Sequence, residues 1–331
     1  MRDVSIGIVC GLTLTLFCTV GGASIAAAEV SEDKQMRQVA VTFDDLPSGG
    51  GSLALDELQA MTEKLLAAIT EHGVPAVGFV NEGKLYQLGE VDERIATLVA
   101  WLDAGLELGN HTFSHPSFHD TPLVKYKEDV IRGETVTRRL VREREGPSSE
   151  LRWFRHPYLR TGRSLADKLS FESFLSARGY TVAPVTLENH DYIYAALYRR
   201  ALKADDQEMA GKVARAYLDF TFELVAFHDA AAETVFGRPI RHVLLLHANE
   251  LNGDHFGAMA ARFKAEGYGF ATLEHVLEDP AYGTQDRYVG PAGVNWIFRW
   301  DQRLNASGGL AVDWSEEPRV QPWIQEAFDN R

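Results

Sequence analysis

The chain has 331 residues, a formal net charge of −14 and 45% hydrophobic residues. This composition is ordinary for one large globular domain or two small ones, and it excludes a wholly disordered chain. Proteins that bind nucleic acid neutralise phosphates with lysine and arginine. With 33 basic against 47 acidic residues, we expect no nucleic-acid partner.

Residues 1–28 are typical of a secretory signal peptide. An apolar stretch at 6–20 is followed by small residues that end in three alanines at 26–28, an A-x-A cleavage pattern. We therefore expect export to the periplasm or the extracellular space, and no stable membrane insertion after cleavage. An uncleaved N-terminal anchor is the alternative, since an aspartate offsets the one positive charge before the apolar stretch.

Both cysteines of the chain, Cys10 and Cys18, lie in this signal. The exported chain would therefore have neither a disulfide nor a reactive thiol. Any catalysis has to use carboxylates, imidazoles, hydroxyls or a metal.

Short apolar runs alternate with amphipathic segments over residues 36–280. The runs predict strands at 39–43, 75–80, 106–108, 151–154, 180–185, 243–246 and 269–273. The segments between them predict helices: one that ends before Gly73, one capped by Asp92, one continuous helix from Pro122 to about Glu145, and one over 164–178. Strand and helix in alternation predict an α/β fold whose parallel sheet is a barrel or doubly wound.

Two segments stand outside this alternation. Residues 193–235 form a long helical insertion, which would be a packing helix or a lid over the site; Tyr217, Phe220 and Leu224 near helical spacing favour packing. Residues 281–331 hold four of the six tryptophans and several prolines. We interpret them as an extension that docks on the barrel through its indoles, with stacking on sugar rings as the alternative.

Asp44 and Asp45 follow the first predicted strand. Adjacent side chains of a strand point to opposite faces, so both carboxylates can face one site only where the strand finishes. A solvated turn is the plain alternative, because aspartate is common in turns.

His111 and His115 follow the third predicted strand, four residues apart. Imidazoles at this spacing can meet one ion from a single turn. One carboxylate with two histidines leaves positions for water and substrate, which is the pattern of catalytic metal sites. His119 continues the spacing, but Pro116 interrupts the turn, so we expect His119 to face solvent.

Three further strands end in ionisable residues. Arg155 begins the motif Arg155-His156-Pro157-Tyr158, Asp191 precedes Tyr192, and His247 follows an unbroken run of leucines. Each motif alone is weak. Their order along the chain resembles that of the polysaccharide deacetylases of carbohydrate esterase family four, together with Thr42-Phe43-Asp44-Asp45 and His111-Thr112-Phe113-Ser114-His115.

The resemblance covers roughly residues 38–278 and implies a distorted (β/α)7 TIM-like barrel with outer helices. It implies that Asp45, His111 and His115 bind a divalent metal, usually zinc. The backbone N–H of Tyr158 would join the metal in stabilising an oxyanion.

The resemblance also implies the groups that move protons. Asp44 would be the general base, oriented by Arg155. His247 would be the general acid, oriented and held cationic by Asp191. An acetamide needs an activated water, a stabilised oxyanion and a proton for its departing amine, and these groups supply all three.

Three positions depart from the family pattern: Leu46 where glycine is usual, Tyr192 where tryptophan is usual, and Ala248 where aspartate is frequent. They leave the expected catalytic residues in place, but they put the substrate groove in doubt. We expect a secreted, metal-dependent hydrolase that removes N-acetyl groups from amino sugars of an acetylated glycan, either peptidoglycan or a chitin-like polymer. An O-acetyl esterase of the xylan type and an inert glycan-binding protein are the alternatives.

Overall fold

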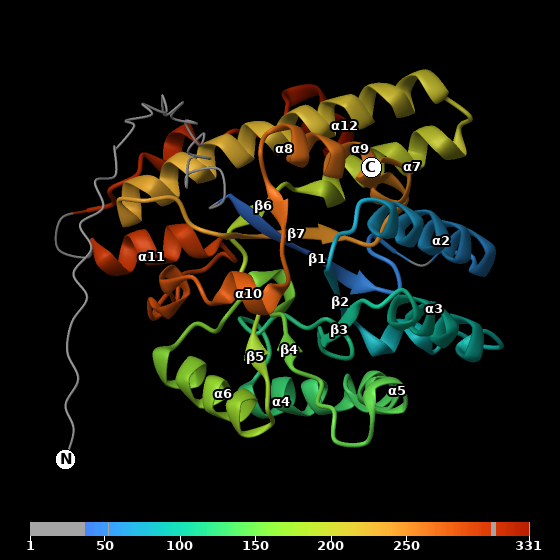
Figure 1. Ribbon diagram of the computed structural model, residues 1–331, viewed down its shortest axis with the longest axis horizontal. Coiled ribbons are helices and arrows are strands. Elements are labelled where there is room, and N and C mark those ends of the chain that lie inside the picture. The colour runs from blue at the N-terminus through green and yellow to red at the C-terminus, as the bar shows by residue number, and fades with distance from the viewer. Residues whose placement is uncertain (1–36, 52, 306–308, 331) are drawn as a thin grey trace, which may run out of the picture.

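The computed structural model describes residues 37–51, 53–305 and 309–330 (Figure 1). The predicted signal peptide therefore lies outside the described residues. Within these ranges, every helix is too short or too polar to cross a membrane.

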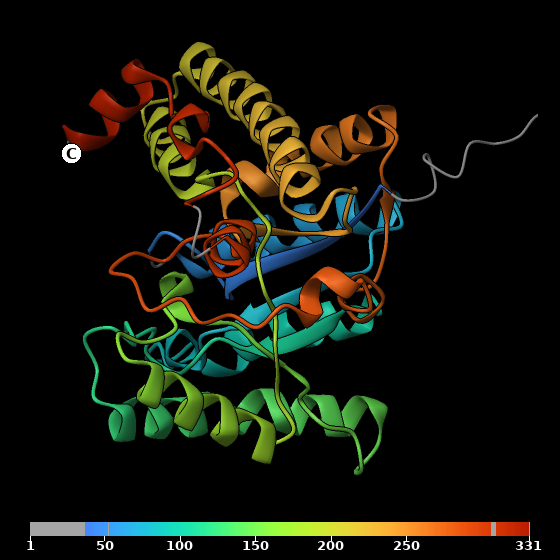
Figure 2. The same cartoon turned by 90° about the vertical axis from the view of Figure 1, so that its left-hand side faces the viewer.

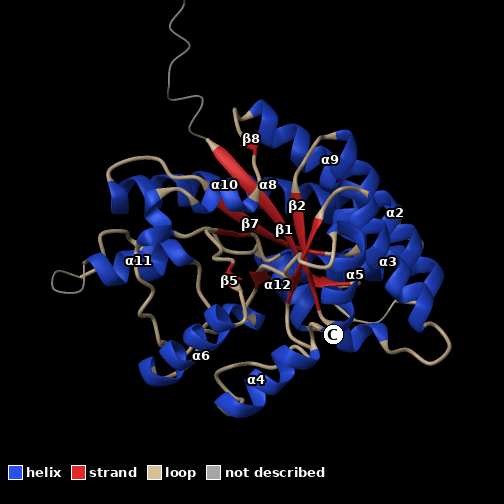
Figure 3. Cartoon of the chain, turned by 60° about the horizontal axis from the view of Figure 1, so that its bottom comes forward, coloured by secondary structure: helices blue, strands red, loops and turns tan. Residues whose placement is uncertain are grey.

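A parallel sheet forms the centre of the molecule, with helices around it (Figure 3). Its strands are β1 Gln38–Leu46, β2 Ala76–Val80, β3 Glu107–Asn110, β4 Trp153–Phe154, β5 Thr181–Val182, β6 Leu187–Glu188, β7 His242–His247 and β8 Gly269–Phe270. They lie in the order β5-β4-β3-β2-β1-β7-β6, β8 pairs with β1, and every pair is parallel. The predicted α/β class, a barrel-like arrangement of parallel strands inside helices, is confirmed.

Only residues 181–182 of the fifth predicted strand, 180–185, form a strand, which is β5. The chain forms β5 beside β4, crosses to the opposite end of the strand order, and then forms β6 beside β7. Pro184 lies in the crossing segment and has no N–H to give to a ladder, which explains the interruption. The sequence pattern missed β6 because its two residues, Leu187 and Glu188, do not form an apolar run.

Helices flank the sheet on both sides (Figure 2). They are α2 Leu55–Glu71, α3 Val91–Asp103, α4 Leu123–Arg132, α5 Thr135–Glu145, α6 Leu165–Ala177, α7 Asp191–Lys203, α8 Gln207–Phe236, α9 Glu250–Ala265, α10 Leu273–Leu277, α11 Trp296–Leu304 and α12 Pro322–Asp329, with short 3₁₀ turns η1 Glu82–Leu85, η2 Pro157–Leu159, η3 Pro280–Gly283 and η4 Trp314–Glu316.

Two helix predictions need correction. The cap of α3 is Glu90, and Asp92 lies inside the first turn, where a carboxylate favours the positive helix end. The predicted continuous helix 122–145 is two helices, α4 and α5, which separate at Gly133. A side chain at Gly133 would overlap the backbone of Thr112, so the helix breaks where it meets the loop after β3.

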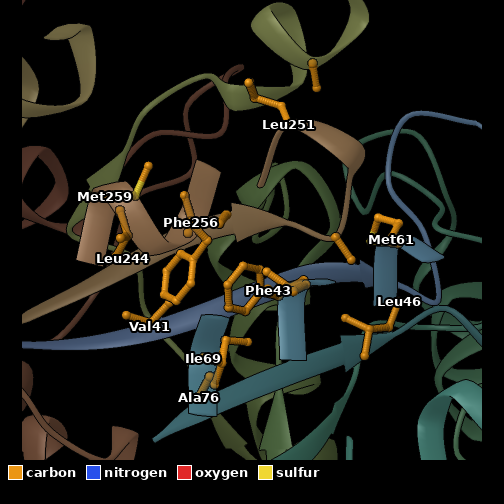
Figure 4. Close-up of a cluster of buried hydrophobic side chains, with 14 of the residues drawn as sticks. Val41, Phe43, Leu46, Met61, Ile69, Ala76, Leu244, Leu251, Phe256 and Met259 are labelled. Atoms are coloured by element: carbon orange, nitrogen blue, oxygen red, sulfur yellow. The ribbon is translucent and has the colours of Figure 1, made fainter. Parts of the chain in front are cut away.

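The largest hydrophobic cluster surrounds the sheet, and one part of it lies between the sheet and helices α2 and α9 (Figure 4). Among its buried members are Val41, Phe43, Leu46, Met61, Ile69, Ala76, Leu244, Leu251, Phe256 and Met259. Phe43 packs edge-on against Trp101 of α3 and Phe256 of α9. Each such large side chain contributes about 1.5–3 kcal/mol by its burial, so this cluster anchors β1 and the aspartates near its end.

The insertion and the extension both pack on the barrel. In α8, Tyr217, Phe220 and Leu224 are buried, so this helix has a packing role. Trp296 and Trp300 of α11 are also buried, in a cluster with residues of α8 and β7, and their indoles therefore fill the interior. This burial leaves neither indole open for stacking on a sugar.

Candidate active site

The end of β1 carries both aspartates toward one site. The register between β1 and β2 shifts between Phe43 and Leu46, and Asp45 has a left-handed backbone with φ of 72°. This irregularity cancels the alternation that would otherwise send Asp44 and Asp45 to opposite faces. Asp44 pairs in register with His247 of β7, so the two lie side by side.

The loop after β3 brings the two histidines to Asp45. Asp45 Oδ1 lies 3.5 Å from Nε2 of His115 and 3.9 Å from Nε2 of His111. One ligand atom from each residue lies within 4.8 Å of the other two. Thr112 and His115 adopt positive φ values of 70° and 56°, which bend this loop around the site.

These three side chains have the chemistry of a divalent-metal site. The Nδ1–H of His111 donates to the Arg155 carbonyl at 2.8 Å, which leaves Nε2 with its lone pair toward Asp45. The buried Oδ1 of Asp45 accepts no hydrogen bond within the described part of the chain. Nitrogen and oxygen donors of this kind suit zinc and related divalent ions.

Charge at the three donors also fits a metal. Burial lowers the pKa of His111 and of His115, so both imidazoles are neutral at pH 7. Burial raises the pKa of Asp45, but nearby positive charge, from Lys84 and from the cationic His247, outweighs it and keeps the pKa below its ordinary value. The group therefore offers one carboxylate and two neutral imidazoles.

Asp44 lies beside these three donors, but its pKa is shifted in the opposite direction from that of Asp45. Burial raises the pKa of Asp44 to about 6, and the Arg155 guanidinium opposes that rise only in part. Arg155 is buried, its Nη1 lies 3.4 Å from Asp44 Oδ1, and its Nη2 donates to Thr42 Oγ1 at 3.0 Å. Asp44 is thus a carboxylate whose proton affinity is close to that of water-activating bases.

His247 is bound to Asp191. Its Nδ1 lies 2.6 Å from Asp191 Oδ1, and its backbone N–H donates to Asp191 Oδ2 at 2.8 Å. Burial lowers the pKa of His247, but the charge and hydrogen bond of Asp191 outweigh burial and raise the pKa to about 10. At neutral pH this imidazole carries a proton.

Tyr158, in the loop after β4, lies beside His115. Its ring contacts the His115 ring at 4.4 Å between centroids, and its side chain is exposed. Tyr158 and Leu159 both have positive φ, 56° and 52°. Among the described residues, no hydrogen-bond acceptor is paired with the Tyr158 N–H.

His119 does not join the site and is not simply solvent-facing as expected. It is half-buried, with Nδ1 3.2 Å from the carbonyl oxygen of Pro291.

The three departures from the family pattern do not fill the site with new charge. Leu46 is fully buried in the core, where Gly78 leaves space for its methyl groups (Figure 4). Ala248 is buried, and its N–H donates to the Asp44 carbonyl at 3.2 Å. Tyr192 is partly exposed, with its ring 6.4 Å from that of His247.

Sequence reasoning missed three residues that contact the site. Lys84 Nζ lies 3.2 Å from Asp45 Oδ1 and is hydrogen-bonded to the Ser48 carbonyl at 3.1 Å. The side-chain amides of Asn249 and Asn252 donate to Asp191 Oδ2, at 3.1 and 2.7 Å. The available signals were a lysine just after β2 and two asparagines just after the β7 histidine.

The chain is similar to known polysaccharide deacetylases over part of its length. The model of a family described as polysaccharide deacetylase matches residues 31–172, and for that region the resemblance seen in the sequence is confirmed. A peptidoglycan-N-acetylglucosamine deacetylase of Bacillus cereus is 32% identical over 104 residues, which are 31% of this chain and 32% of that protein. The chain thus matches about a third of the length of this relative.

The chain is also similar to several solved structures. Peptidoglycan deacetylase PdaC from Bacillus subtilis is 17% identical, with 74% of this chain and 94% of that chain covered and a TM-score of 0.45. A family 4 carbohydrate esterase from Streptomyces lividans in complex with acetate is 18% identical (72% and 95% covered, TM-score 0.44). A pseudoenzyme of the same esterase family from Bacillus anthracis is 14% identical (74% and 66% covered, TM-score 0.47).

Proposed function

We propose that this chain, which matches the polysaccharide deacetylase family over residues 31–172, is an exported, metal-dependent hydrolase of N-acetyl groups on glycan amino sugars. It would release acetate and leave a free amine on the polymer. The peptidoglycan-type relative supports a cell-wall glycan as substrate. The proposed export depends on the predicted signal at residues 1–28.

One observation carries this proposal: neutral imidazoles and a protonated imidazole surround the same two carboxylates. His111 lies 3.7 Å from Asp44 and 3.9 Å from Asp45, and burial keeps it neutral by lowering its pKa. His247 pairs with Asp44 across β1 and β7, and Asp191 raises its pKa to about 10. Ligand donors and a proton donor are therefore separate groups within one site.

Asp45, His111 and His115 would hold the metal, with zinc as the proposed ion. When bound, such an ion lowers the pKa of a coordinated water and polarises an acyl oxygen. The burial of His111 excludes bulk solvent from its ring, and its bond to the Arg155 carbonyl holds the ligand nitrogen in place.

Asp44 would take the proton from the attacking water. Its pKa of about 6 makes it largely ionised at neutral pH, yet basic enough to accept a proton as the new C–O bond forms. Arg155 would orient this carboxylate through its contact at 3.4 Å. The Tyr158 N–H would donate to the developing oxyanion.

His247 would protonate the leaving nitrogen. A deacetylated amine cannot leave as an anion, so the proton has to arrive as the C–N bond breaks. Asp191 accepts from both the ring and the backbone N–H of His247, and it thereby fixes the ring with Nε2 as the remaining donor.

Metal analysis with an acetate-release screen tests this proposal. The purified chain would be incubated with zinc and with N-acetylglucosamine oligomers, peptidoglycan and acetylxylan, beside an Asp44→Asn variant as the matched control. We expect about one metal per chain, and acetate together with new amines from the N-acetyl polymers. Asp44→Asn should bind the same metal and release little acetate.

The other outcomes overturn specific parts of the proposal. Acetate from acetylxylan alone would make the chain an O-acetyl esterase. Glycan binding without metal or acetate would make it an inert glycan-binding protein.

A further inference from the structure

The loop after β4 is held in an unfavourable backbone conformation. Tyr158 and Leu159 are consecutive non-glycine residues with φ of 56° and 52°. A positive φ is unfavourable for each of these residues, so the surrounding structure has to impose the conformation. The supporting contacts come from the C-terminal extension, which passes beside this loop (Figure 2).

Gly293 touches the Tyr158 peptide directly. A Cβ added to Gly293 would overlap the carbonyl oxygen of Tyr158, and it would lie 2.8 Å from the Tyr158 carbonyl carbon. Only glycine permits two backbones to approach this closely. The extension is thus in close backbone contact with Tyr158, whose N–H is the proposed oxyanion donor.

Arg299 of α11 holds the next peptide. Its Nη2 donates to the Leu159 carbonyl at 2.5 Å, and its Nη1 donates to Thr161 Oγ1 at 3.0 Å. The other hydrogen bonds of the guanidinium go to Asp286 Oδ2 at 2.8 Å and to the Val294 carbonyl at 2.9 Å. Since this guanidinium is fully buried, it is stable only while these acceptors stay in place.

Lys168 of α6, in the barrel, contacts the same two partners as Arg299 does, namely Asp286 and Thr161. Its Nζ lies 2.6 Å from Asp286 Oδ2 and donates to Thr161 Oγ1 at 3.1 Å. Asp286 therefore joins one cation of the barrel to one cation of the extension. A third bond, from Lys168 to the Tyr288 carbonyl at 3.2 Å, ties the extension to α6.

We infer that the C-terminal extension is part of the active-site scaffold, with Gly293 and Arg299 as positioning residues for the Tyr158 N–H. This inference rests on the proposed deacetylase function for its kinetic consequence. Its structural part, that the extension holds residues 157–161 in shape, can be measured without any turnover.

Gly293→Ala is the direct test, with Gly283→Ala as the matched control. Gly283 lies in the same extension, and a Cβ added there meets no atom within 4 Å. In Gly293→Ala we expect faster amide hydrogen exchange over 157–161, unchanged exchange over 107–115, and unchanged zinc affinity. The value of kcat on an acetylated oligosaccharide should fall about 10- to 100-fold with little change in KM, because a misplaced oxyanion donor acts in the transition state.

Arg299→Met is the second test, with Arg299→Lys and Arg303→Met beside it. Arg303 is an exposed residue of the same helix, so its replacement should match the parent chain. Arg299→Lys keeps a cation but loses the forked geometry, so it should recover part of the kcat lost in Arg299→Met. If Arg299→Met does not fold, Gly293→Ala alone decides.

Three results separate this inference from the proposed function. Faster exchange over 157–161 with lowered kcat supports the inference. Exchange and kcat both within twofold of the parent chain overturn it, even if the chain is an active deacetylase. If the parent chain releases no acetate from any glycan, the proposed function fails, and the exchange measurement still decides whether the extension holds the loop.

Discussion

The metal side and the acid side of the site contain the same side chain in opposite charge states. On the metal side, the Nδ1–H of His111 donates to a neutral carbonyl, and burial lowers the pKa of the ring. On the acid side, the Nδ1 of His247 meets the Asp191 carboxylate at 2.6 Å, and the pKa rises to about 10. Both rings are close to the two aspartates of β1.

The hydrogen-bond partner of Nδ1 therefore decides whether each ring can serve as a metal ligand or as an acid. A carbonyl partner stabilises the neutral tautomer and leaves a lone pair for a metal. A carboxylate partner stabilises the cation and leaves a proton to give. The same residue type can therefore serve as a ligand and as an acid within one site. Single substitutions can test the metal side and the acid side separately.

Asp45→Ala should have the largest effect, because it removes the one anionic donor of the metal side. We expect zinc affinity to fall by more than about 10²-fold, the upper range seen when only an outer partner of a ligand is lost. Chelator competition with zinc measures this, and Asp120→Ala, an exposed carboxylate near the same loop, is the control. Unchanged zinc affinity would remove Asp45 from the ligand set.

Asp44→Asn should separate base from ligand. We expect kcat to fall about 10² to 10⁴-fold, the size expected for a lost general base, while zinc affinity stays within a few-fold. Parallel zinc titration and acetate-release kinetics measure the two quantities. If zinc is lost together with activity, Asp44 belongs to the metal side.

Asp191→Asn should shift His247 from the cationic state toward the neutral state that His111 has. Without the carboxylate, His247 loses the largest contribution that raises its pKa, so we expect the pKa to fall from about 10 toward its ordinary value near 6.5. At pH 8.5 about one ring in a hundred would be protonated, so kcat should fall about 10²-fold there and recover as the pH is lowered.

The titration of His247 by NMR in the metal-free chain measures this change directly. In the parent chain the raised pKa also stabilises the fold fully below about pH 6.5, and this contribution is lost as the pH rises toward about 10. Asp206→Asn, which changes an exposed helix cap, is the control. A His247 titration unchanged by Asp191→Asn would contradict the assignment.

Lys84→Met should have the smallest effect and the opposite sign. The Lys84 ammonium lies 3.2 Å from the Asp45 oxygen that faces the two histidines, so it repels an incoming dication. We expect zinc affinity to rise about three- to tenfold. Lys64→Met, at an exposed ion pair, is the control, and weaker zinc binding by Lys84→Met would show that Lys84 instead holds Asp45 in place.

The residues of the expected site could be picked out from the sequence because of one topological rule. Carboxyl ends of parallel strands meet at one edge, so ionisable residues at or just after the ends of β1, β3, β4 and β7 are expected to lie close together. Neither β6 nor the break at Gly133 could be read from periodicity. The two residues of β6 do not form an apolar run, and the helix breaks at Gly133 where it contacts the backbone of Thr112, about twenty residues earlier. Lys84, Asn252 and Arg299 were missed for the same reason, since each acts through a contact far away in sequence.

The sequence by itself thus determined the α/β class, the order of the motifs and the residue types available for chemistry. Only the tertiary structure decided that Asp45 turns to the same side as Asp44, that His111 is neutral while His247 is charged, and that the extension supports the Tyr158 loop. The physical reason is that backbone strain and pKa depend on burial and on partners, and both are set by residues brought together from distant parts of the chain.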